Sequence, residues 1–286
     1  MNTATHPQLV TDELRRWIVF QAEAGCRPED VLASMRASGW AEDVAISALE
    51  ATLMQRLEQL GLPVPTAPVP LPEPALEAQP ASLFALDREV QVITSLRLPR
   101  VVVFGGVLSN EECDQLVALS RTRLARSETV DNQTGGSEVN AARTSDGMFF
   151  ERGEFPLIDR IERRLAALLN WPLDHGEGLQ VLRYRPGAEY RPHHDYFDPA
   201  QPGAATILQR GGQRLATLIM YLSTPERGGG TVFPDAGLEV APVKGHAVFF
   251  SYDRPHQATR TLHGGAPVLE GEKWVATKWL RQGVFA

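Results

Sequence analysis

Apolar side chains recur at helical spacing along the first part of the chain. Thr11 is a favoured N-cap residue for the first of these segments, and Gly25 stops it. Pro28 suits the first turn of a second segment, and a third apolar segment follows it. The pattern predicts a small all-helical domain, a bundle of three helices, over residues 1–61.

A proline-rich segment follows this helical region. Residues 62–80 contain seven prolines. Such a composition favours the extended polyproline II conformation and cannot build a core of its own. We therefore expect a linker over residues 62–82 that separates two domains.

Short runs rich in β-branched and aromatic residues replace the helical spacing later in the chain. After residue 178 they follow one another without helices between them, and Gly and Pro separate them. The runs are LQVLRY, LATLIMYL, GTVF, HAVFFSY and KWVATKWL. Many short strands that are punctuated in this way predict a sandwich or a barrel.

Two helical segments precede these strands. Ser109, with Glu112 three residues later, has the signature of a capping box at the start of one helix. Residues 155–170 have the amphipathic pattern of the other. We therefore predict a mainly β domain with supporting helices over residues 83–286, in which the two helices cover one face of the sheets.

A long polar segment interrupts this domain between its helices. Residues 126–147 contain glycine and few apolar side chains. Loops of this length inside a compact domain are usually functional. The segment is therefore a candidate lid over a binding site.

The net charge of −7 is unevenly distributed along the chain. Residues 1–61 hold nine acidic and five basic side chains, and the linker adds Glu73 and Glu77, which leaves about −1 for the remainder. A nearly neutral domain has no electrostatic footprint for nucleic acid or for an anionic membrane. No apolar run is long enough to span a bilayer. We expect neither nucleic acid nor membrane as a partner.

The cysteine content points to a reducing compartment. Cys26 and Cys113 are the two cysteines of the chain, and the pattern assigns them to different domains. A disulfide framework is therefore not expected. The first residues lack a basic region followed by an apolar run, so we expect no signal peptide and a cytoplasmic location.

The stretch YRPHHDYF, residues 190–197, is a candidate metal site. If it is a strand, His193 and Asp195 point to the same side and His194 points away. Two His and one carboxylate make the facial triad of non-haem Fe(II) oxygenases, and no zinc protease motif is present. The candidates for the second histidine are His246, His256 and His263.

Six stretches of the domain carry a resemblance to a known family. In order they are RTSDGMFF, LRYRPGAEYRPHHDYF, GGQRLATLIMYL, GGGTVFP, GHAVFF and LHGGAPVLEGEKWVATKW. By their spacing and order, most of residues 95–283 resembles the prolyl 4-hydroxylase family of 2-oxoglutarate- and Fe(II)-dependent dioxygenases. The resemblance implies a double-stranded β-helix, the jelly roll, as the catalytic domain.

The resemblance also implies roles for individual residues. His193, Asp195 and His263 match the family's iron ligands, and Lys273 matches the basic residue that pairs with the distal carboxylate of 2-oxoglutarate. Among the histidine candidates His256 lacks a basic residue ten positions later, which favours His263. The positions implied to contact the cosubstrate are Tyr184, Tyr221 and Thr231, besides Lys273. The positions implied to hold the peptide substrate are Tyr190, Arg214, Trp279 and Arg143, of which Arg143 could equally be a structural anchor of its loop.

The implied activity is hydroxylation of proline in a peptide or protein, with 2-oxoglutarate and O2 converted to succinate and CO2. The implied cofactors are Fe(II), 2-oxoglutarate as cosubstrate and, as an optional addition, ascorbate. One alternative is a hydroxylase of a free amino acid or another small molecule. A second alternative is a non-catalytic interaction protein in which residues 1–61 carry the function.

Residues 1–61 lie outside this resemblance. Their pattern weakly resembles the ubiquitin-associated type of three-helix module, which binds peptides or proteins. A helical appendage that packs or dimerises is the favoured interpretation. A protein partner for this domain is the alternative.

Overall fold

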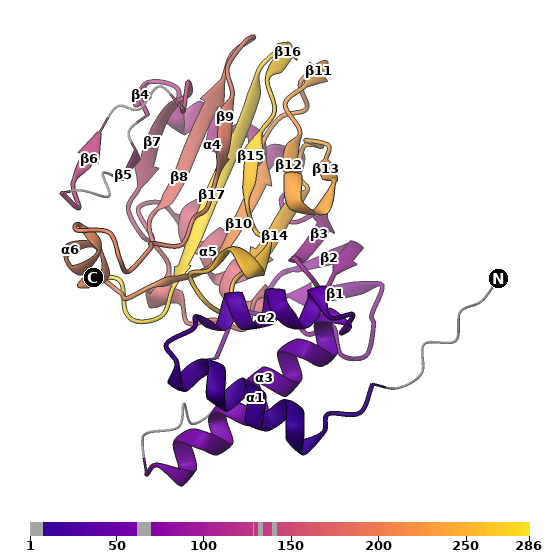
Figure 1. Cartoon of the computed structure of the whole chain (residues 1–286). Helices are drawn as coiled ribbons and strands as arrows, with labels where there is room; N and C mark the ends of the chain where they lie inside the picture. Colours follow the sequence, from indigo (N-terminus) through magenta and orange to yellow (C-terminus); the bar gives the residue numbers. More distant parts are fainter. Residues whose placement is uncertain (1–7, 62–69, 128, 131–133, 139–141) are drawn as a thin grey trace. The chain divides into compact units, whose positions relative to one another are not determined.

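The computed structural model describes residues 8–61, 70–127, 129–130, 134–138 and 142–286. The chain divides into two compact units, Met1–Val69 and Pro70–Ala286 (Figure 1). Each unit has a hydrophobic core of its own. The division lies inside the proline-rich segment, so the second half of that segment belongs to the larger unit.

The smaller unit is the predicted bundle of three helices, α1 (Asp12–Glu23), α2 (Pro28–Ala37) and α3 (Glu42–Gln59). Thr11 caps α1 by accepting a hydrogen bond from the backbone N–H of Leu14. Pro28 occupies the first turn of α2 as expected. The buried side chains of its core are Ile18, Val31, Met35, Ala45, Ala48 and Leu49.

The larger unit is built mainly from strands. Its helices are α4 (Asn110–Ser120), α5 (Pro156–Leu168) and α6 (Ala204–Leu208). Its first strands are β1 (Ser82–Ala85), β2 (Arg88–Leu96), β3 (Arg100–Gly105), β4 (Ala125–Arg126), β5 (Thr129–Val130), β6 (Ser137–Glu138), β7 (Asp146–Phe150), β8 (Leu179–Tyr184) and β9 (Tyr190–His193). The others are β10 (Arg214–Tyr221), β11 (Arg227–Gly228), β12 (Thr231–Phe233), β13 (Leu238–Val240), β14 (Ala247–Ser251), β15 (His263–Gly265), β16 (Val268–Glu270) and β17 (Lys273–Arg281).

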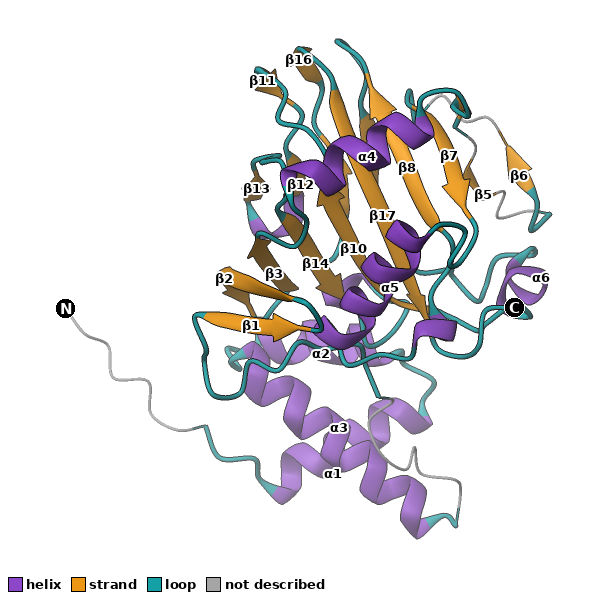
Figure 2. Ribbon diagram, turned by 180° about the vertical axis from the view of Figure 1, so that it is seen from behind, coloured by secondary structure: helices purple, strands orange, loops and turns teal. Residues whose placement is uncertain are grey.

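Most of these strands form the two facing sheets of a jelly roll, and β11–β16 and β5–β6 form two separate two-stranded sheets. The large sheet has the order β1-β2-β3-β14-β10-β17-β8-β7-β4, and the small sheet has the order β13-β12-β15-β9. A cluster of buried aromatic and branched side chains, among them Phe233 from β12 and Phe250 from β14, fills the space between the sheets. Helices α4 and α5 cover the other face of the large sheet (Figure 2). The predicted mainly β fold with helices on one face is confirmed.

Local sequence signals account for several of these elements. Ser109 and Glu112 form both hydrogen bonds of the predicted capping box at the start of α4. The run LQVLRY is β8, and KWVATKWL begins at the first residue of β17. Both strands are buried along nearly their whole length, because one face meets the small sheet and the other meets the helices.

The β1–β2 hairpin at the edge of the large sheet was not predicted. Phe84 on β1 is 77% exposed and Ile93 on β2 is 49% exposed. On β2 the alternation of a half-buried strand holds from Glu89 to Ile93, with Val90 and Val92 inward, and a register shift between Val92 and Thr94 ends it. The alternation in EVQV was therefore a short strand signal that the sequence-based prediction did not use.

The described end of the proline-rich segment packs against the larger unit instead of acting as a free spacer. The backbone N–H of Glu73 donates to the carbonyl of Leu169 at 2.9 Å. The carboxylate of Glu73 accepts a hydrogen bond from Arg100 Nε at 2.8 Å. Leu76 packs against the core beneath α5. Residues 70–81 are therefore a strap that belongs to the larger unit.

We expect removal of this strap to destabilise the larger unit. A chain that begins at residue 70 should unfold at the same urea concentration as the larger unit of the full chain. A chain that begins at residue 82 should lose roughly 2–4 kcal/mol, because a half-buried Leu and several hydrogen bonds are lost. Glu73→Ala should reproduce part of this loss, and the exposed Glu77→Ala should not. Equal stability of the two truncated chains would contradict the assignment of the strap.

The predicted lid contains short strands. Within residues 126–147 the structure describes β5 paired with β6, and the beginning of β7. Residues 128, 131–133 and 139–141 lie outside the described part of the chain. The role of the segment as a lid stays a prediction.

Two further expectations concern membranes and thiols. Over the residues that the structure describes, none of the helices combines the length and the apolar character that a bilayer crossing requires. Cys26 lies exposed in the smaller unit and Cys113 lies buried in the larger one, and both are free thiols.

Candidate metal centre

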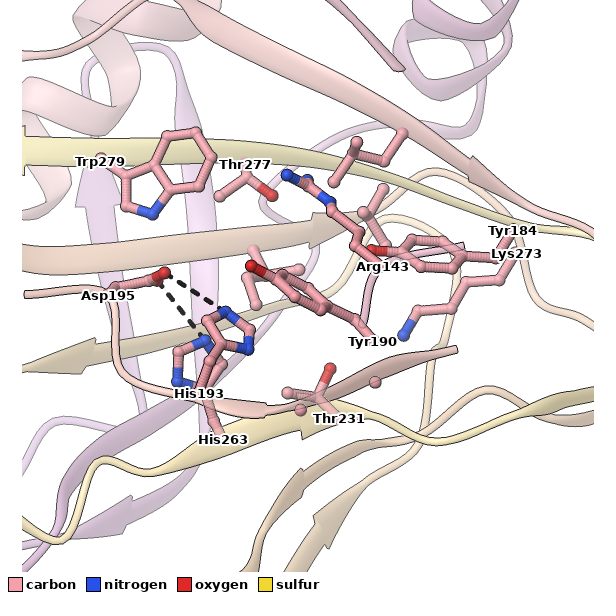
Figure 3. Close-up of a pocket in the computed structure, with 15 residues that line it drawn as sticks. Arg143, Tyr184, Tyr190, His193, Asp195, Thr231, His263, Lys273, Thr277 and Trp279 are labelled. Carbon is pink, nitrogen blue, oxygen red and sulfur yellow. Dashed lines mark ion pairs between the residues drawn. The ribbon is translucent and has the colours of Figure 1, made fainter. Parts of the chain in front are cut away.

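Three side chains at one end of the strand pair β9–β15, at the edge of the small sheet, converge on one point. His193 is the last residue of β9, His263 is the first of β15, and these two strands are antiparallel neighbours with the two histidines paired. Asp195 Oδ1 lies 3.4 Å from His193 Nε2, and Asp195 Oδ2 lies 3.4 Å from His263 Nε2 (Figure 3). Neighbouring ligands of an octahedral ion that are each about 2.1 Å from it lie about 3 Å apart. The triad therefore has the spacing of a metal site.

Backbone contacts determine which nitrogen each histidine offers. His193 Nδ1 lies 3.0 Å from the carbonyl of Arg191, and His263 Nδ1 lies 3.0 Å from the carbonyl of Thr261. A carbonyl oxygen only accepts, so each Nδ1 carries the proton and donates it. Each Nε2 is then left with a lone pair that points at the centre of the triad. Metal-binding histidines commonly donate their other ring N–H to a carbonyl in this way.

The charges of the triad suit a bound cation. Burial, together with the neighbouring His263, lowers the pKa of His193, so its imidazole is neutral at neutral pH. Burial opposes ionisation of Asp195, but the imidazoles of His263 and His193 outweigh it and hold the pKa of this carboxyl well below its usual range. The triad therefore offers two imidazole nitrogens and a carboxylate to a cation. Over the residues that the structure describes, this is the one group of His, Cys, Asp and Glu with such geometry.

The structure excludes His194 from the metal site for a reason other than strand alternation. Strand β9 ends at His193, so Asp195 lies in the bend after the strand and not on it. His194 turns away and stacks on Tyr196, with the ring centres 4.6 Å apart. Strand alternation thus predicted that His194 points away from His193 and Asp195. The backbone nevertheless leaves the strand between His193 and Asp195.

The triad closes one end of a pocket between the sheets. The pocket encloses about 440 Å³ of space, solvent at its open mouth included. Its floor is formed by side chains from the inward face of two central strands. They are Leu182 and Tyr184 of β8 and Lys273, Val275, Thr277 and Trp279 of β17. Thr277 was not singled out from the sequence, although strict alternation from Lys273 would have identified it.

Lys273 lies at the end of the pocket opposite the triad (Figure 3). Its side chain is buried, and over the described residues no carboxylate lies within salt-bridge distance of Nζ. Burial lowers the pKa of Lys273 to about 8, and the more distant Glu239 offsets only part of this effect. A buried cation without a partner anion is unfavourable by itself. The pocket is therefore built to receive an anion at this end.

The three residues expected beside Lys273 do not all face the pocket. Tyr184 and Thr231 line it. Tyr221 is fully buried behind Thr231, and its hydroxyl donates to Thr231 Oγ1 at 2.8 Å. Tyr221 therefore orients the hydroxyl of Thr231, and Thr231 is the group that a ligand would meet.

A second groove also borders the triad. It is lined in part by Arg143, Tyr190 and Trp279, which also line the inner pocket. The ring of Tyr190 stacks on His193 at 3.7 Å, with the guanidinium of Arg143 over its other face at 4.9 Å. Trp279 is 7% exposed, and its indole N–H has no acceptor among the described residues. Burial raises the pKa of Tyr190 to about 12, so its phenol stays neutral.

Arg214 is held by other protein groups at the base of this groove. Its guanidinium forms two hydrogen bonds with the buried carboxylate of Glu177, at 2.6 and 2.9 Å. It stacks beneath Trp279 at 4.2 Å, and it lies 3.4 Å from the carbonyl of Asp195. The geometry favours support of Trp279 and Asp195 over a direct contact with a ligand. Sequence patterns did not reveal Glu177, because the pair joins strand β10 to a distant loop.

Comparison with known proteins agrees with this site. The profile of the 2OG-Fe(II) oxygenase superfamily matches residues 179–281, which include the triad and Lys273. The probable prolyl 4-hydroxylase 3 of Arabidopsis thaliana is 42% identical over 208 residues, which cover 65% of this chain and 71% of the relative. The prolyl 4-hydroxylase 1 of the same plant is 46% identical over 202 residues, or 64% and 69%.

Solved structures include a similar protein from a virus. The viral collagen prolyl hydroxylase of Paramecium Bursaria Chlorella virus-1, in complex with 2OG, is 33% identical, with a TM-score of 0.49 and coverage of 63% of this chain and 95% of that one. The resemblance on which the expected site rests is confirmed by the sequence relatives. The chain belongs to the prolyl 4-hydroxylase family of 2-oxoglutarate- and Fe(II)-dependent oxygenases.

Proposed function

We propose that the protein hydroxylates proline residues in a peptide or protein, with Fe(II) as cofactor and 2-oxoglutarate and O2 as cosubstrates. The observation that carries the proposal is the placement of a metal triad at one end of a pocket and, at the other end, of a buried Lys that has no carboxylate within salt-bridge distance among the described residues. 2-Oxoglutarate is a dicarboxylate with a keto group at one end. Such a molecule needs a metal ion to bind its keto end and a cation to bind its other carboxylate.

The proposed metal ligands are His193, Asp195 and His263. Their free Nε2 lone pairs and ionised carboxylate fit Fe(II), and they leave half of an octahedral ion's positions open. The bound iron supplies activation of O2 and oxidation of an unactivated C–H bond. The chain's own groups hold the reactants in place and keep water away, and this site accordingly needs no nucleophilic side chain.

Lys273 is the proposed anchor for the distal carboxylate of 2-oxoglutarate. Its ammonium lies in a largely apolar wall, where a charge-assisted hydrogen bond is strong. The hydroxyl of Thr231, oriented by Tyr221, offers a further donor or acceptor. Tyr184, whose ring centre lies 5.5 Å from Lys273 Nζ, would cover the carbon chain between the two ends.

The outer groove is the proposed site of the peptide. Tyr190 and Trp279 form apolar walls beside the metal, and the indole N–H of Trp279 can donate to a peptide carbonyl. Arg143 borders the same groove and supports Tyr190. We assign Arg214 a supporting role behind Trp279.

Trp279→Phe is expected to raise the KM for a peptide about 3- to 10-fold, because one hydrogen bond is lost while the ring stays. The slow consumption of 2-oxoglutarate without peptide should not change. Trp171→Phe is the matched control, since the Trp171 indole donates to the carbonyl of Arg281 away from the groove. Steady-state kinetics with peptide varied at saturating 2-oxoglutarate measures the effect. An unchanged KM would remove Trp279 from the peptide site.

The helical unit and the location of the protein also belong to this proposal. We propose that residues 1–61 do not take part in the chemistry; a helical appendage that packs or dimerises stays the favoured interpretation, and a protein partner stays the alternative. The metal triad, Lys273 and both cavities lie within the larger unit. A chain of residues 70–286 should therefore retain turnover of a short peptide.

Free thiols at Cys26 and Cys113 support a reducing, cytoplasmic location.

One assay separates this function from its alternatives. Proline-containing peptides and free proline are each incubated with Fe(II) and 2-oxoglutarate, and mass spectrometry detects the addition of one oxygen atom. Hydroxylation of peptides alone supports the proposal. Hydroxylation of free amino acid alone identifies the small-molecule alternative. Absence of 2-oxoglutarate consumption with every substrate would favour a non-catalytic interaction protein.

A further inference from the structure

Two buried hydroxyl groups connect the large sheet to the carboxylate of the metal centre. Thr217 lies on β10 and is fully buried, and Tyr252, directly after β14, is 2% exposed. Thr217 Oγ1 lies 2.7 Å from Asp195 Oδ2 and 3.1 Å from the hydroxyl oxygen of Tyr252. Neither residue was singled out from the sequence.

The chemistry of the three groups fixes the direction of both hydrogen bonds. The carboxylate of Asp195 is ionised and only accepts, so Thr217 donates its single hydroxyl proton to Oδ2. The oxygen of Thr217 is then left as an acceptor, and the phenol of Tyr252 donates to it. Each proton is committed to one acceptor, so the hydroxyl of Thr217 has one orientation.

The two oxygens of Asp195 are otherwise in equivalent positions. Oδ1 faces His193 and Oδ2 faces His263, each at 3.4 Å. The carboxylate by itself could bind an ion through either oxygen or through both. The hydrogen bond from Thr217 makes the two oxygens of Asp195 different as metal ligands, because one lone pair of Oδ2 already accepts that hydrogen bond.

We propose that Thr217, oriented by Tyr252, is a positioning residue that restricts Asp195 to binding the metal through Oδ1 alone. A carboxylate that bound through both oxygens would occupy a position that 2-oxoglutarate or O2 requires. Arg214 restrains the same residue from its backbone, 3.4 Å from the carbonyl of Asp195. The inference rests on the proposed role of Asp195 as a metal ligand.

The positioning role of Thr217 is tested by anaerobic titration of the protein with Co(II) in the absence of 2-oxoglutarate. The titration measures the affinity for Co(II), and the visible absorption of bound Co(II) reports its coordination number. Thr217→Val keeps the shape of the side chain and removes the hydroxyl. It should weaken Co(II) binding about 10-fold or more and alter the spectrum. Thr217→Ser should stay close to the unaltered protein. Tyr252→Phe should cause a smaller loss, and the double variant T217V/Y252F should be no weaker than T217V, because Tyr252 acts through Thr217.

Two variants that remove a buried hydroxyl outside the pocket serve as controls. Ser120→Ala and Ser145→Ala each remove a fully buried hydroxyl, which donates to the carbonyl of Leu116 and to Ser127 Oγ respectively and does not contact Asp195. Both should bind Co(II) with unchanged affinity. A comparable loss in these controls would mean that general loosening of the sheet, and not the contact with Asp195, causes the effect.

The outcomes separate this inference from the proposed function. Unchanged Co(II) binding by Asp195→Ala would overturn the ligand set itself. Loss of binding in Asp195→Ala together with unchanged affinity and spectrum in T217V would overturn the positioning role alone. If T217V does not fold, Tyr252→Phe decides the question: an affinity and spectrum equal to those of the unaltered protein contradict the role of the two hydroxyl groups.

Discussion

His193→Ala, Asp195→Ala and His263→Ala are each expected to abolish 2-oxoglutarate consumption and stoichiometric binding of Fe(II). Each change removes one of the three groups whose donor atoms converge within 4.8 Å of one another. Two protein ligands seldom hold a divalent ion against water, so the effect should exceed that of any other single change in the pocket. Anaerobic equilibrium dialysis measures the bound iron, and succinate formation measures turnover.

His194→Ala is the matched control for these changes. It removes the same kind of side chain from the neighbouring position, but His194 stacks on Tyr196 and points away from the triad. We expect this variant to bind one equivalent of Fe(II) and to keep much of its turnover. Loss of iron in His194→Ala, with retention in His193→Ala, would reverse the assignment of the two histidines.

Lys273→Met is expected to raise the Kd of 2-oxoglutarate at least about 100-fold, with little change in Fe(II) affinity. Removal of one partner of a buried charge pair costs about 3–5 kcal/mol, because the other charge is left without compensation. Calorimetric titration of 2-oxoglutarate into anaerobic, metal-loaded protein measures the change. An unchanged Kd would mean that Arg260 or Lys278 is the anchor, although Lys278 is engaged with Glu162.

The same residue predicts a pH dependence. Burial lowers the pKa of Lys273 to about 8 in the free protein, and only the protonated form can pair with a carboxylate. The affinity for 2-oxoglutarate should therefore be constant below about pH 8 and fall up to tenfold per pH unit above it. Lys273→Arg keeps its charge throughout this range, so its affinity should not fall between pH 8 and 10. Parallel profiles for the two proteins would assign the titration to another group.

Local patterns predicted the elements whose signals lie within a few residues. The capping box of Ser109 and Glu112, the run that forms β8 and the alternation along β17 each depend on a single segment. The metal ligands could be identified from the sequence, because the His-x-Asp motif and the order of the stretches that match the family can both be read along the chain. The triad's assembly nevertheless depends on pairing of β9 with β15, which joins residues 70 positions apart.

The features that the sequence did not reveal depend on contacts between distant segments. Thr217 contacts Asp195, which lies 22 residues earlier in the chain, and Tyr252, which lies 35 residues later. The register of β10 against β14 brings Thr217 and Tyr252 together. Arg214 was expected at the substrate, but its partner Glu177 lies 37 residues away and engages its guanidinium. The strap at residues 70–81 has the composition of a free linker, and only the surface beneath α5 shows why it packs.

Isotope labelling tests the central claim most directly. The full chain is incubated with Fe(II), 2-oxoglutarate and a proline-rich peptide under O2 gas of a heavy oxygen isotope, and the products are analysed by mass spectrometry. We expect one heavy oxygen atom in a hydroxyproline and one in succinate for each 2-oxoglutarate consumed, and neither product with Asp195→Ala. Consumption of 2-oxoglutarate without hydroxylation of proline in any peptide, or a hydroxyl oxygen that derives from water, would contradict the account.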